Sequence, residues 1–422
     1  MIARGKLRHH RHRRLIHGRG YFSRLGPGFV TGAADDDPSG IGTYVQVGAR
    51  FGTSLLWAMP LLLPLAIAVQ ELAARIGLTT GHGLAHAVRK RSNRVLLWSV
   101  VVTVAVANTL NVAADLAAMG AAVRLLVPVS SVVTVITIGC TVVILDIVVP
   151  YQRSARVLRW LACSLLAYPL VLVFESVAWR NALHSTFAPN ISLERQTIAA
   201  LIALFGTTVS PYLYFWQASE EVEENKGQRR VDRGHIRAMR TDVASGMGSA
   251  IIAAWAIILV GSASLHDNGI TDVASAAAAA DALRPVAGDM AGFVFALGIV
   301  GLGLLAIPVL AGSTAYAVAE ASGWSEGLSQ RWRAARGFYG VIIVSIAVAI
   351  VIDLAGLDPM RGLFLAAVAN GLAAPPLILV MLFVARDREQ LGSWRAGWAA
   401  SFGALAAAIV SIALPCWWLV IS

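Results

Sequence analysis

Three consecutive carboxylates, Asp35, Asp36 and Asp37, stand inside a stretch that is otherwise apolar enough for a lipid bilayer. An aspartate at mid-membrane costs roughly 2.5 to 3.5 kcal/mol, so a run of three persists only where something compensates it. Pro38 removes a backbone donor and Gly40 loosens the chain, so the first span should break here and leave free carbonyls beside the carboxylates. Such oxygens, at the negative end of a half-helix, are what a cation requires. A short loop of solvated aspartates is the alternative.

A second interruption lies in the sixth apolar segment, which reads LFGTTVSPYLYFWQASEEVEE. Gly206, Thr207, Ser210 and Pro211 stand in the middle of this run and weaken helical pairing there. Breaks in the first and sixth spans predict two inverted repeats of about five helices each, with a site at mid-membrane where the breaks meet. This pattern is typical of a secondary transporter, whereas either break alone could be a proline kink without function.

The composition is that of a membrane protein, because 57% of the 422 residues are hydrophobic and only 14% are charged. A soluble domain carries about a quarter charged residues. The three cysteines, Cys140, Cys163 and Cys416, lie far apart in apolar segments, which excludes a disulfide framework or a zinc cluster. The net charge of +10 falls in loops between apolar segments. We therefore interpret it as a signal for membrane orientation and expect no nucleic-acid partner.

Apolar segments of about 20 residues, the length that spans a bilayer, recur about eleven times. We place them at 27–50, 54–77, 95–123, 129–149, 155–174, 196–224, 242–265, 290–318, 337–355, 362–385 and 398–421. Basic residues cluster in alternate loops, on the same side as an Arg- and His-rich N-terminal tail. The N-terminus is therefore expected in the cytoplasm and the C-terminus outside, in a prokaryotic inner (plasma) membrane.

The expected organisation is an all-α polytopic membrane protein with one functional domain. Residues 1–26 form the basic cytoplasmic tail and residues 27–422 the transmembrane domain. Its first repeat covers about 27–174, its second about 190–385, and an extra helix follows at about 398–421.

Polar residues also occur inside other spans. Asn108, Asn111 and Asp115 follow one another at three and four residues and so share one face of the third span, and Asn370 lies in the tenth. Such residues either line a proton or ion path or join helices by hydrogen bonds. Both interpretations stay open.

The inner end of the sixth span carries an acidic cluster. The loop that follows this cluster in the sequence contains several arginines. We interpret this helix end as a solvated, charge-paired surface rather than an exit route for cations. Its members are Glu220, Glu221, Glu223 and Glu224.

Four stretches of the sequence carry a family likeness. They are, in order, GPGFVTGAADDDPSGIGTYVQVGARFG, LAARIGLTTGHGLAHAVRK, VAADLAA and GTTVSPYLYFWQAS. Through them the chain resembles the NRAMP divalent-metal transporters over most of its length. The resemblance implies a LeuT-type fold with helices 1 and 6 broken, and metal uptake that is usually coupled to protons. The family's span-one motif is Asp-Pro-Gly-Asn. Asp37 and Pro38 match it, Ser39 takes the third position, and Gly40 replaces the ligand asparagine.

The span-six motif of the family, Met-Pro-His, matches only at Pro211. Ser210 stands at the thioether position and Tyr212 at the histidine position. By the same resemblance, backbone carbonyl ligands fall at Ala34 and Thr207.

The resemblance also bears on proton transfer. Asp115 matches an acid that the family associates with this step, while a glutamate expected one turn later is Ala118. The candidate proton or ion path therefore comprises Asp115, Tyr212, Asn108, Asn111 and Asn370.

These departures lead to a prediction about the ion. A thioether favours softer transition metals, so Ser210 removes a filter against Mg²⁺ and Ca²⁺ and leaves an all-oxygen site. The small Gly40 and Ser210 should also widen the cavity, which suits Mg²⁺ because that ion gives up its waters reluctantly. The pattern resembles the NRAMP-related magnesium transporter branch. We predict transport of Mg²⁺ with Mn²⁺ tolerated.

In this prediction Asp37 binds the ion. Asp35 and Asp36 supply negative field or outer-shell contacts, and Ala34, Gly40, Thr207 and Ser210 complete the site. Loss of the histidine and glutamate argues against proton coupling, although three adjacent carboxylates titrate as a coupled set, which leaves proton displacement by metal open.

Two other functions are compatible with the sequence. A carrier of the same fold could move an organic cation or an amino acid, and a membrane receptor could sense metal without transporting it. No His-Glu-x-x-His, Gly-x-Ser-x-Gly or nucleotide-binding loop occurs, so we do not expect an enzyme. We expect no resident cofactor, because the metal ion is the transported substrate. We also expect the lipid bilayer as the surroundings of the protein and no obligate protein partner.

Overall fold

The computed structural model describes residues 26–149, 172–173, 177–189, 192–225, 231–273, 280, 288, 291–356 and 358–421. Within these ranges the chain is helical. The helices are α1 (Pro27–Asp35), α2 (Pro38–Phe51), α3 (Ala58–Thr80), α4 (Leu84–Arg91), α5 (Arg94–Arg124), α6 (Ser131–Val148), α9 (Trp179–Phe187), α10 (Arg195–Thr208), α11 (Pro211–Glu224), α12 (Arg233–Ser264), α15 (Ala291–Ser322), α16 (Arg336–Leu354), α17 (Pro359–Ala385), α18 (Arg388–Leu391) and α19 (Trp398–Val420).

Nine helical segments of the described ranges are long and apolar enough to cross a membrane, with α10 and α11 counted as one. They match nine of the expected spans. The first expected span is divided between α1 and α2, which are individually too short to cross. The span expected at 155–174 and the tail at 1–26 lie almost wholly outside the described residues.

Both expected breaks are present, and each has the same local cause. α1 ends at Asp35 and α2 begins at Pro38, with Asp37 as its N-cap. α10 ends at Thr208 and α11 begins at Pro211. Proline suits the first position of a helix but cannot continue one, so each proline ends one half-helix and starts the next.

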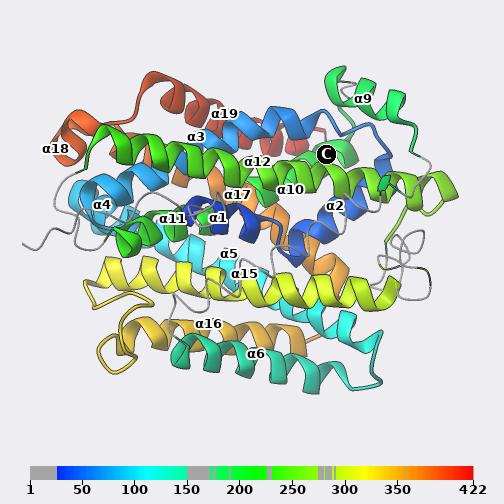
Figure 1. Cartoon of the computed structure of the whole chain (residues 1–422), viewed down its shortest axis with the longest axis horizontal. Coiled ribbons are helices and arrows are strands. Elements are labelled where there is room, and N and C mark those ends of the chain that lie inside the picture. The colour runs from blue at the N-terminus through cyan, green and yellow to red at the C-terminus, as the bar shows by residue number, and fades with distance from the viewer. Residues whose placement is uncertain are drawn as a thin grey trace, which may run out of the picture.

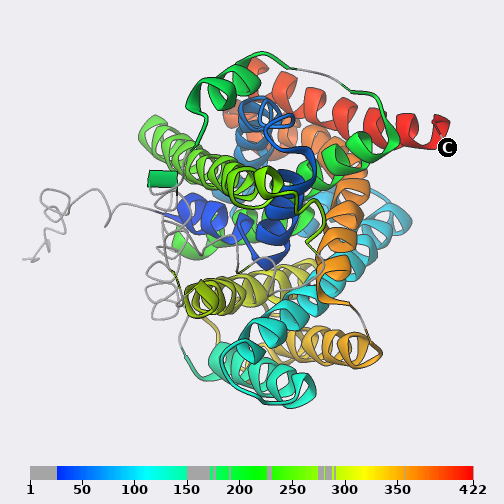
Figure 2. The same cartoon turned by 90° about the vertical axis from the view of Figure 1, so that its right-hand side faces the viewer.

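The broken helices lie in the middle of the bundle. In Figure 1, α1, α2, α10 and α11 occupy the centre, α3, α12 and α19 lie on one side, and α5, α15, α16 and α6 lie on the other. Figure 2, turned by 90°, shows α6 and α16 together at the edge of the bundle, far from α19. The interrupted segments are therefore shielded from the surroundings by continuous helices on both sides.

Small residues let the half-helices approach their neighbours. A Cβ added to Gly48 of α2 would lie 2.1 Å from the carbonyl oxygen of Ile258 in α12. At Gly206 of α10, it would lie 1.9 Å from the carbonyl oxygen of Ala367 in α17. Both distances are far below van der Waals contact, so only glycine permits this packing.

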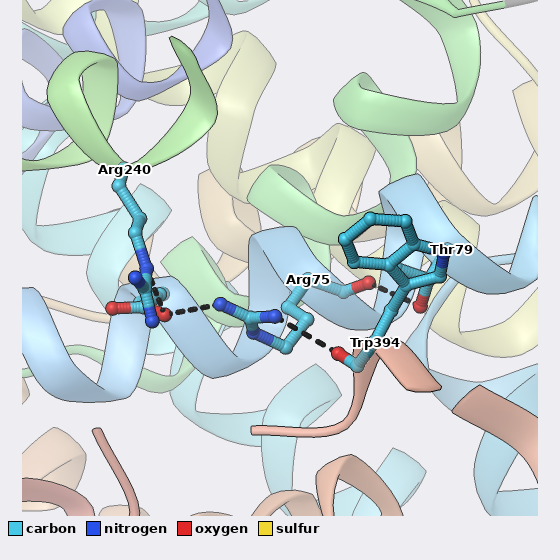
Figure 3. A network of polar contacts seen from close by, with 5 residues as sticks. Arg75, Thr79, Arg240 and Trp394 are labelled. Carbon is cyan, nitrogen blue, oxygen red and sulfur yellow. Dashed lines mark hydrogen bonds and ion pairs between the residues drawn. The ribbon is translucent and has the colours of Figure 1, made fainter. Parts of the chain in front are cut away.

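An ionic network ties α3 to α12 near the end of the bundle that carries α4 (Figure 3). Glu71 Oε1 accepts hydrogen bonds from Arg75 Nη2 at 2.5 Å and from Arg240 Nε at 2.8 Å. Arg75 Nη1 also donates to the carbonyl oxygen of Trp394, in the turn before α19, at 2.9 Å. The Arg75 side chain is only 4% exposed, so its charge depends on these partners.

Candidate functional site

Asp37 lies in the gap between α1 and α2 and is 2% exposed. Its Oδ1 accepts hydrogen bonds from the backbone N–H of Gly40 and from the Ser39 hydroxyl, both at 2.7 Å. These bonds fix the carboxylate as the cap of α2 and hold it in one orientation. Its Oδ2 faces the other broken helix, where the Tyr212 hydroxyl lies 3.4 Å away.

Tyr212 joins the two breaks. Its hydroxyl donates to the carbonyl oxygen of Ala34, near the end of α1, at 2.8 Å, and its ring is 1% exposed. The two interruptions therefore meet inside the protein, and Asp37 is buried beside the start of α11. This juxtaposition is what the paired breaks in the sequence predict.

The end of α10 is closed by Ser210. Its hydroxyl lies 2.7 Å from the carbonyl oxygens of both Gly206 and Thr207. The family resemblance assigns the carbonyls of Ala34 and Thr207 to the ion. Both carbonyls accept a hydrogen bond from a hydroxyl group of the protein, Ala34 from Tyr212 and Thr207 from Ser210. The Thr207 hydroxyl oxygen, buried as well, has no hydrogen-bond partner in the described part of the chain.

Gly40 does not leave the wide space that its small size suggests. A Cβ placed there would lie 3.1 Å from Cγ2 of Thr207 and 3.2 Å from the carbonyl oxygen of Asp35. The expectation of a wider cavity at this position is therefore wrong for this conformation. The absent side chain lets the two breaks approach one another, and Thr207 takes up the room.

Asp35 and Asp36 are fully buried, and none of their four carboxylate oxygens has a hydrogen-bond partner among the residues that the structure places. A buried carboxylate without a partner is costly, so a cation or a proton must neutralise it. The three aspartates do not gather around one point, since no group of three or more His, Cys, Asp or Glu side chains within the described ranges could hold a metal ion. Direct ligation by all three is not what this geometry offers, and outer-shell roles for Asp35 and Asp36 stay a prediction.

The polar face of α5 contains two asparagines, which bond to neighbouring helices, and the acid Asp115. The Asn108 side chain donates to the carbonyl oxygen of Leu310 at 3.2 Å and to the Thr314 hydroxyl at 2.9 Å, both in α15. Asn111 donates to Asn370 Oδ1 in α17 at 3.0 Å. These bonds join helices, which is one of the two interpretations of the asparagines from the sequence. A role in an ion path stays a prediction for them.

Asp115 differs from these asparagines. It is fully buried, its carboxylate lies beside the backbone N–H of Ser39, and it interacts electrostatically with Asp37. Its proximity to the site is what a group that exchanges protons or charge with Asp37 requires. The path itself stays a prediction.

The acidic end of α11 is a solvated surface only in its last residues, Glu223 and Glu224, which are half-buried and exposed. Glu220 is 0% and Glu221 4% exposed. Glu221 accepts from the side chains of Gln217 at 3.2 Å and Asn225 at 3.3 Å. The expectation is wrong for these two because α11 packs closely on α3 and α15, where a Cβ on Gly77 would lie 2.0 Å from the carbonyl oxygen of Ala218.

A cavity of about 750 Å³ lies beside the C-terminal half of α2. It is bounded by α2, α10, the start of α17 and residues 272–273. Gln46 donates to Asp272 Oδ1 at 3.3 Å, and Arg50 donates to Gln196 Oε1 at 2.9 Å, so polar contacts cross its walls. Neither Gln46 nor Arg50 is among the site residues predicted from the sequence. Their spacing of four residues on an otherwise apolar half-helix was the available signal.

Two broken half-helix pairs that meet around a buried carboxylate, inside a bundle of apolar helices, define the class of protein. This is the architecture of a secondary transporter of the LeuT type. The chain belongs to the Nramp family, described as natural resistance-associated macrophage protein-like, whose family model matches residues 28–421.

Curated relatives and solved structures agree with this assignment. The chain is 27% identical to the divalent metal cation transporter MntH of Pectobacterium carotovorum, over 92% of each chain. It is 25% identical to that of Caldanaerobacter subterraneus, over 87% of this chain and 86% of the relative.

Among solved structures, the Eremococcus coleocola manganese transporter superposes with a TM-score of 0.75 at 17% identity, covering 95% of this chain and 87% of that one. Mhp1, a nucleobase-cation-symport-1 family transporter, gives a TM-score of 0.63 at 13% identity, covering 94% of this chain and 92% of that one. These likenesses concern the fold.

Proposed function

We propose that this protein is a secondary transporter of divalent metal cations that moves Mg²⁺, with Mn²⁺ tolerated, by alternating access around Asp37. The proposal rests chiefly on one observation. The carboxylate of Asp37 is buried where the two broken helices meet, and its hydrogen-bond partners within the described residues are two hydroxyl groups and a backbone N–H. The names of the curated relatives support a divalent cation as cargo.

Oxygen donors without a thioether or imidazole favour hard cations. Ser210 and Tyr212 occupy the positions where the family motif has methionine and histidine. Carboxylate, carbonyl and hydroxyl oxygens suit Mg²⁺, Ca²⁺ and Mn²⁺, whereas softer metals prefer sulfur and nitrogen. Mg²⁺ is commonly held by one or two carboxylates while it keeps several waters, which fits a site with a single well-oriented carboxylate.

In the proposed mechanism the cation enters from outside through the cavity beside α2 and reaches Asp37 at mid-depth. Ala34, Gly40, Thr207 and Ser210 surround the ion, and Asp35 and Asp36 contribute negative field. Movement of the inner halves α1 and α11 then opens the opposite side. The protein acts in this proposal as an integral protein of a prokaryotic plasma membrane, with the N-terminus in the cytoplasm and the C-terminus outside. It needs no resident cofactor or obligate protein partner and performs no enzymatic step.

Flux into liposomes that contain the purified protein tests this proposal. Mg²⁺, Mn²⁺ and Ca²⁺ are compared while a trapped dye reports internal pH. We expect uptake of Mg²⁺ and Mn²⁺ by the wild-type chain and strong loss of uptake in Asp37→Ala. Uptake that is the same in Asp37→Ala and in the wild-type chain would remove the assignment of the site.

A carrier of organic cations or amino acids is the second candidate. The observation in its favour is the cavity of about 750 Å³, since pockets for small organic ligands measure about 300 to 1,000 Å³. Calorimetry separates the two, because an organic carrier binds an amine or amino acid and releases no heat with divalent ions. A metal-sensing receptor would bind the ions without any flux.

A further inference from the structure

The Tyr212 hydroxyl lies close to two oxygen atoms that an ion at Asp37 would approach from the side of α11, the carbonyl oxygen of Ala34 and Oδ2 of Asp37. It donates to the carbonyl oxygen of Ala34 at 2.8 Å and lies 3.4 Å from Asp37 Oδ2. A phenol hydroxyl has one hydrogen, which here points to the carbonyl. The hydroxyl thus lies beside both the Ala34 carbonyl oxygen and Asp37 Oδ2, and a cation that bridges these two oxygens on this side must displace it.

The hydroxyl cannot leave easily, because Tyr212 is anchored from the other side. Its backbone carbonyl accepts a hydrogen bond from the Ser313 hydroxyl in α15 at 2.8 Å, and its ring is buried. Asn108 of α5 lies within 3.4 Å of the same Ser313 hydroxyl. Withdrawal of the phenol thus requires a shift of α11 against α15 or a rotamer change in a packed interior.

We propose that Tyr212 determines how many waters the bound cation keeps, and thereby the preference between Mg²⁺ and Mn²⁺. This inference rests on the proposed function and deepens it. While the hydroxyl holds the Ala34 carbonyl, an ion bound to Asp37 lacks one protein ligand and fills that position with water. Such a site favours Mg²⁺, which gives up its waters reluctantly, over an ion that gains more from direct protein ligands.

Replacement of the hydroxyl by hydrogen changes this balance. Tyr212→Phe keeps the ring and its packing, frees the Ala34 carbonyl and leaves Asp37 Oδ2 without its neighbour. Direct coordination by the carbonyl then becomes available, and Mn²⁺ should gain more from it than Mg²⁺. We expect the ratio of Mn²⁺ to Mg²⁺ affinity to rise about fivefold, the factor that corresponds to one hydrogen bond of about 1 kcal/mol.

Tyr214→Phe is the matched control. Tyr214 is also fully buried in α11, and its hydroxyl donates to the carbonyl oxygen of Val209 at 2.6 Å rather than to Ala34 or Asp37. Isothermal titration calorimetry on the purified full-length chain gives the affinities for MgCl₂ and MnCl₂. A rise of the ratio in Tyr212→Phe alone supports the proposal. An unchanged ratio in Tyr212→Phe, or an equal rise in Tyr214→Phe, overturns it.

The water ligands of the bound ion can also be measured directly, in the wild-type protein first. Electron–nuclear double resonance of bound Mn²⁺ in D₂O detects exchangeable water ligands. We expect Mn²⁺ to retain water in the wild-type site and to retain fewer waters in Tyr212→Phe. An ion without water in the wild-type chain contradicts the proposal. Absence of any divalent-ion binding in calorimetry would instead refute the proposed function, so the two failures are distinguishable.

Discussion

The ionic network at Glu71 predicts an asymmetric loss of stability. Glu71→Gln removes the carboxylate that pairs with Arg75, whose side chain is 4% exposed. The Trp394 carbonyl remains as a partner but carries no charge. An uncompensated buried charge costs about 3 to 5 kcal/mol, so we expect Glu71→Gln to lower the free energy of unfolding by about that amount. Arg240→Gln should cost under about 1 kcal/mol, because the Arg240 side chain is half exposed.

An exposed pair supplies the control. Glu389 binds Arg91 at 3.0 Å but is 82% exposed, so Glu389→Gln should cost under about 1 kcal/mol. Equilibrium unfolding of the purified variants in mixed detergent and sodium dodecyl sulfate micelles gives the free energies. The double variant Glu71→Gln/Arg75→Gln should recover much of the loss, because removal of both charges leaves none unpaired. Equal costs for Glu71→Gln and Glu389→Gln would refute the reasoning, since they would mean that the Arg75 charge is solvated.

The remaining predictions concern helix packing at Gly206, the pH dependence of stability at His86 and ion binding by Asp37. Gly206→Ala should lower the free energy of unfolding by about 3 kcal/mol, the upper end of the usual cost of overpacking, because its Cβ would lie 1.9 Å from a backbone oxygen. Gly298→Ala, where a Cβ meets nothing within 4 Å, should be neutral or stabilising, and thermal melting followed by size-exclusion chromatography compares the two. Burial, helped by nearby positive charges, lowers the pKa of His86 from 6.5 to about 4. The folded chain therefore keeps His86 neutral, while the unfolded chain takes up a proton there as the pH falls below about 6.5. The free energy of unfolding is accordingly highest above about pH 6.5 and decreases as the pH falls toward about 4. His86→Gln should weaken the dependence of the melting temperature on pH in this window; an unaltered dependence would rule out His86 as its source. Asp37→Asn, which keeps the shape of the side chain, should abolish calorimetric Mg²⁺ binding, and retained binding would contradict the site.

The sequence was sufficient for the architecture because its strongest signals are local. Apolar runs of bilayer length predict the spans, and a proline preceded by polar residues predicts each break at Pro38 and Pro211. The meeting of the two breaks follows from their positions in an inverted repeat. None of these signals requires knowledge of which side chains touch.

What the sequence did not predict depends on contacts between helices. Glu220 and Glu221 look like a solvated helix end, but the close approach of α11 to α3 and α15 buries them. Gly40 suggests space, but the opposing break moves into it, so Thr207 lies close by. The hydrogen bond from Tyr212 to Ala34 joins residues 178 positions apart. Such pairs carry no local pattern by which a single sequence could reveal them.

The position of the bound ion tests the central claim most directly. A crystal structure of the full chain with Mn²⁺, recorded at a wavelength where manganese scatters anomalously, locates the ion without assumptions about its ligands. We predict one anomalous peak next to Asp37, between the end of α1 and the start of α11. A peak elsewhere, with none at Asp37, in protein that transports Mn²⁺ would contradict the account.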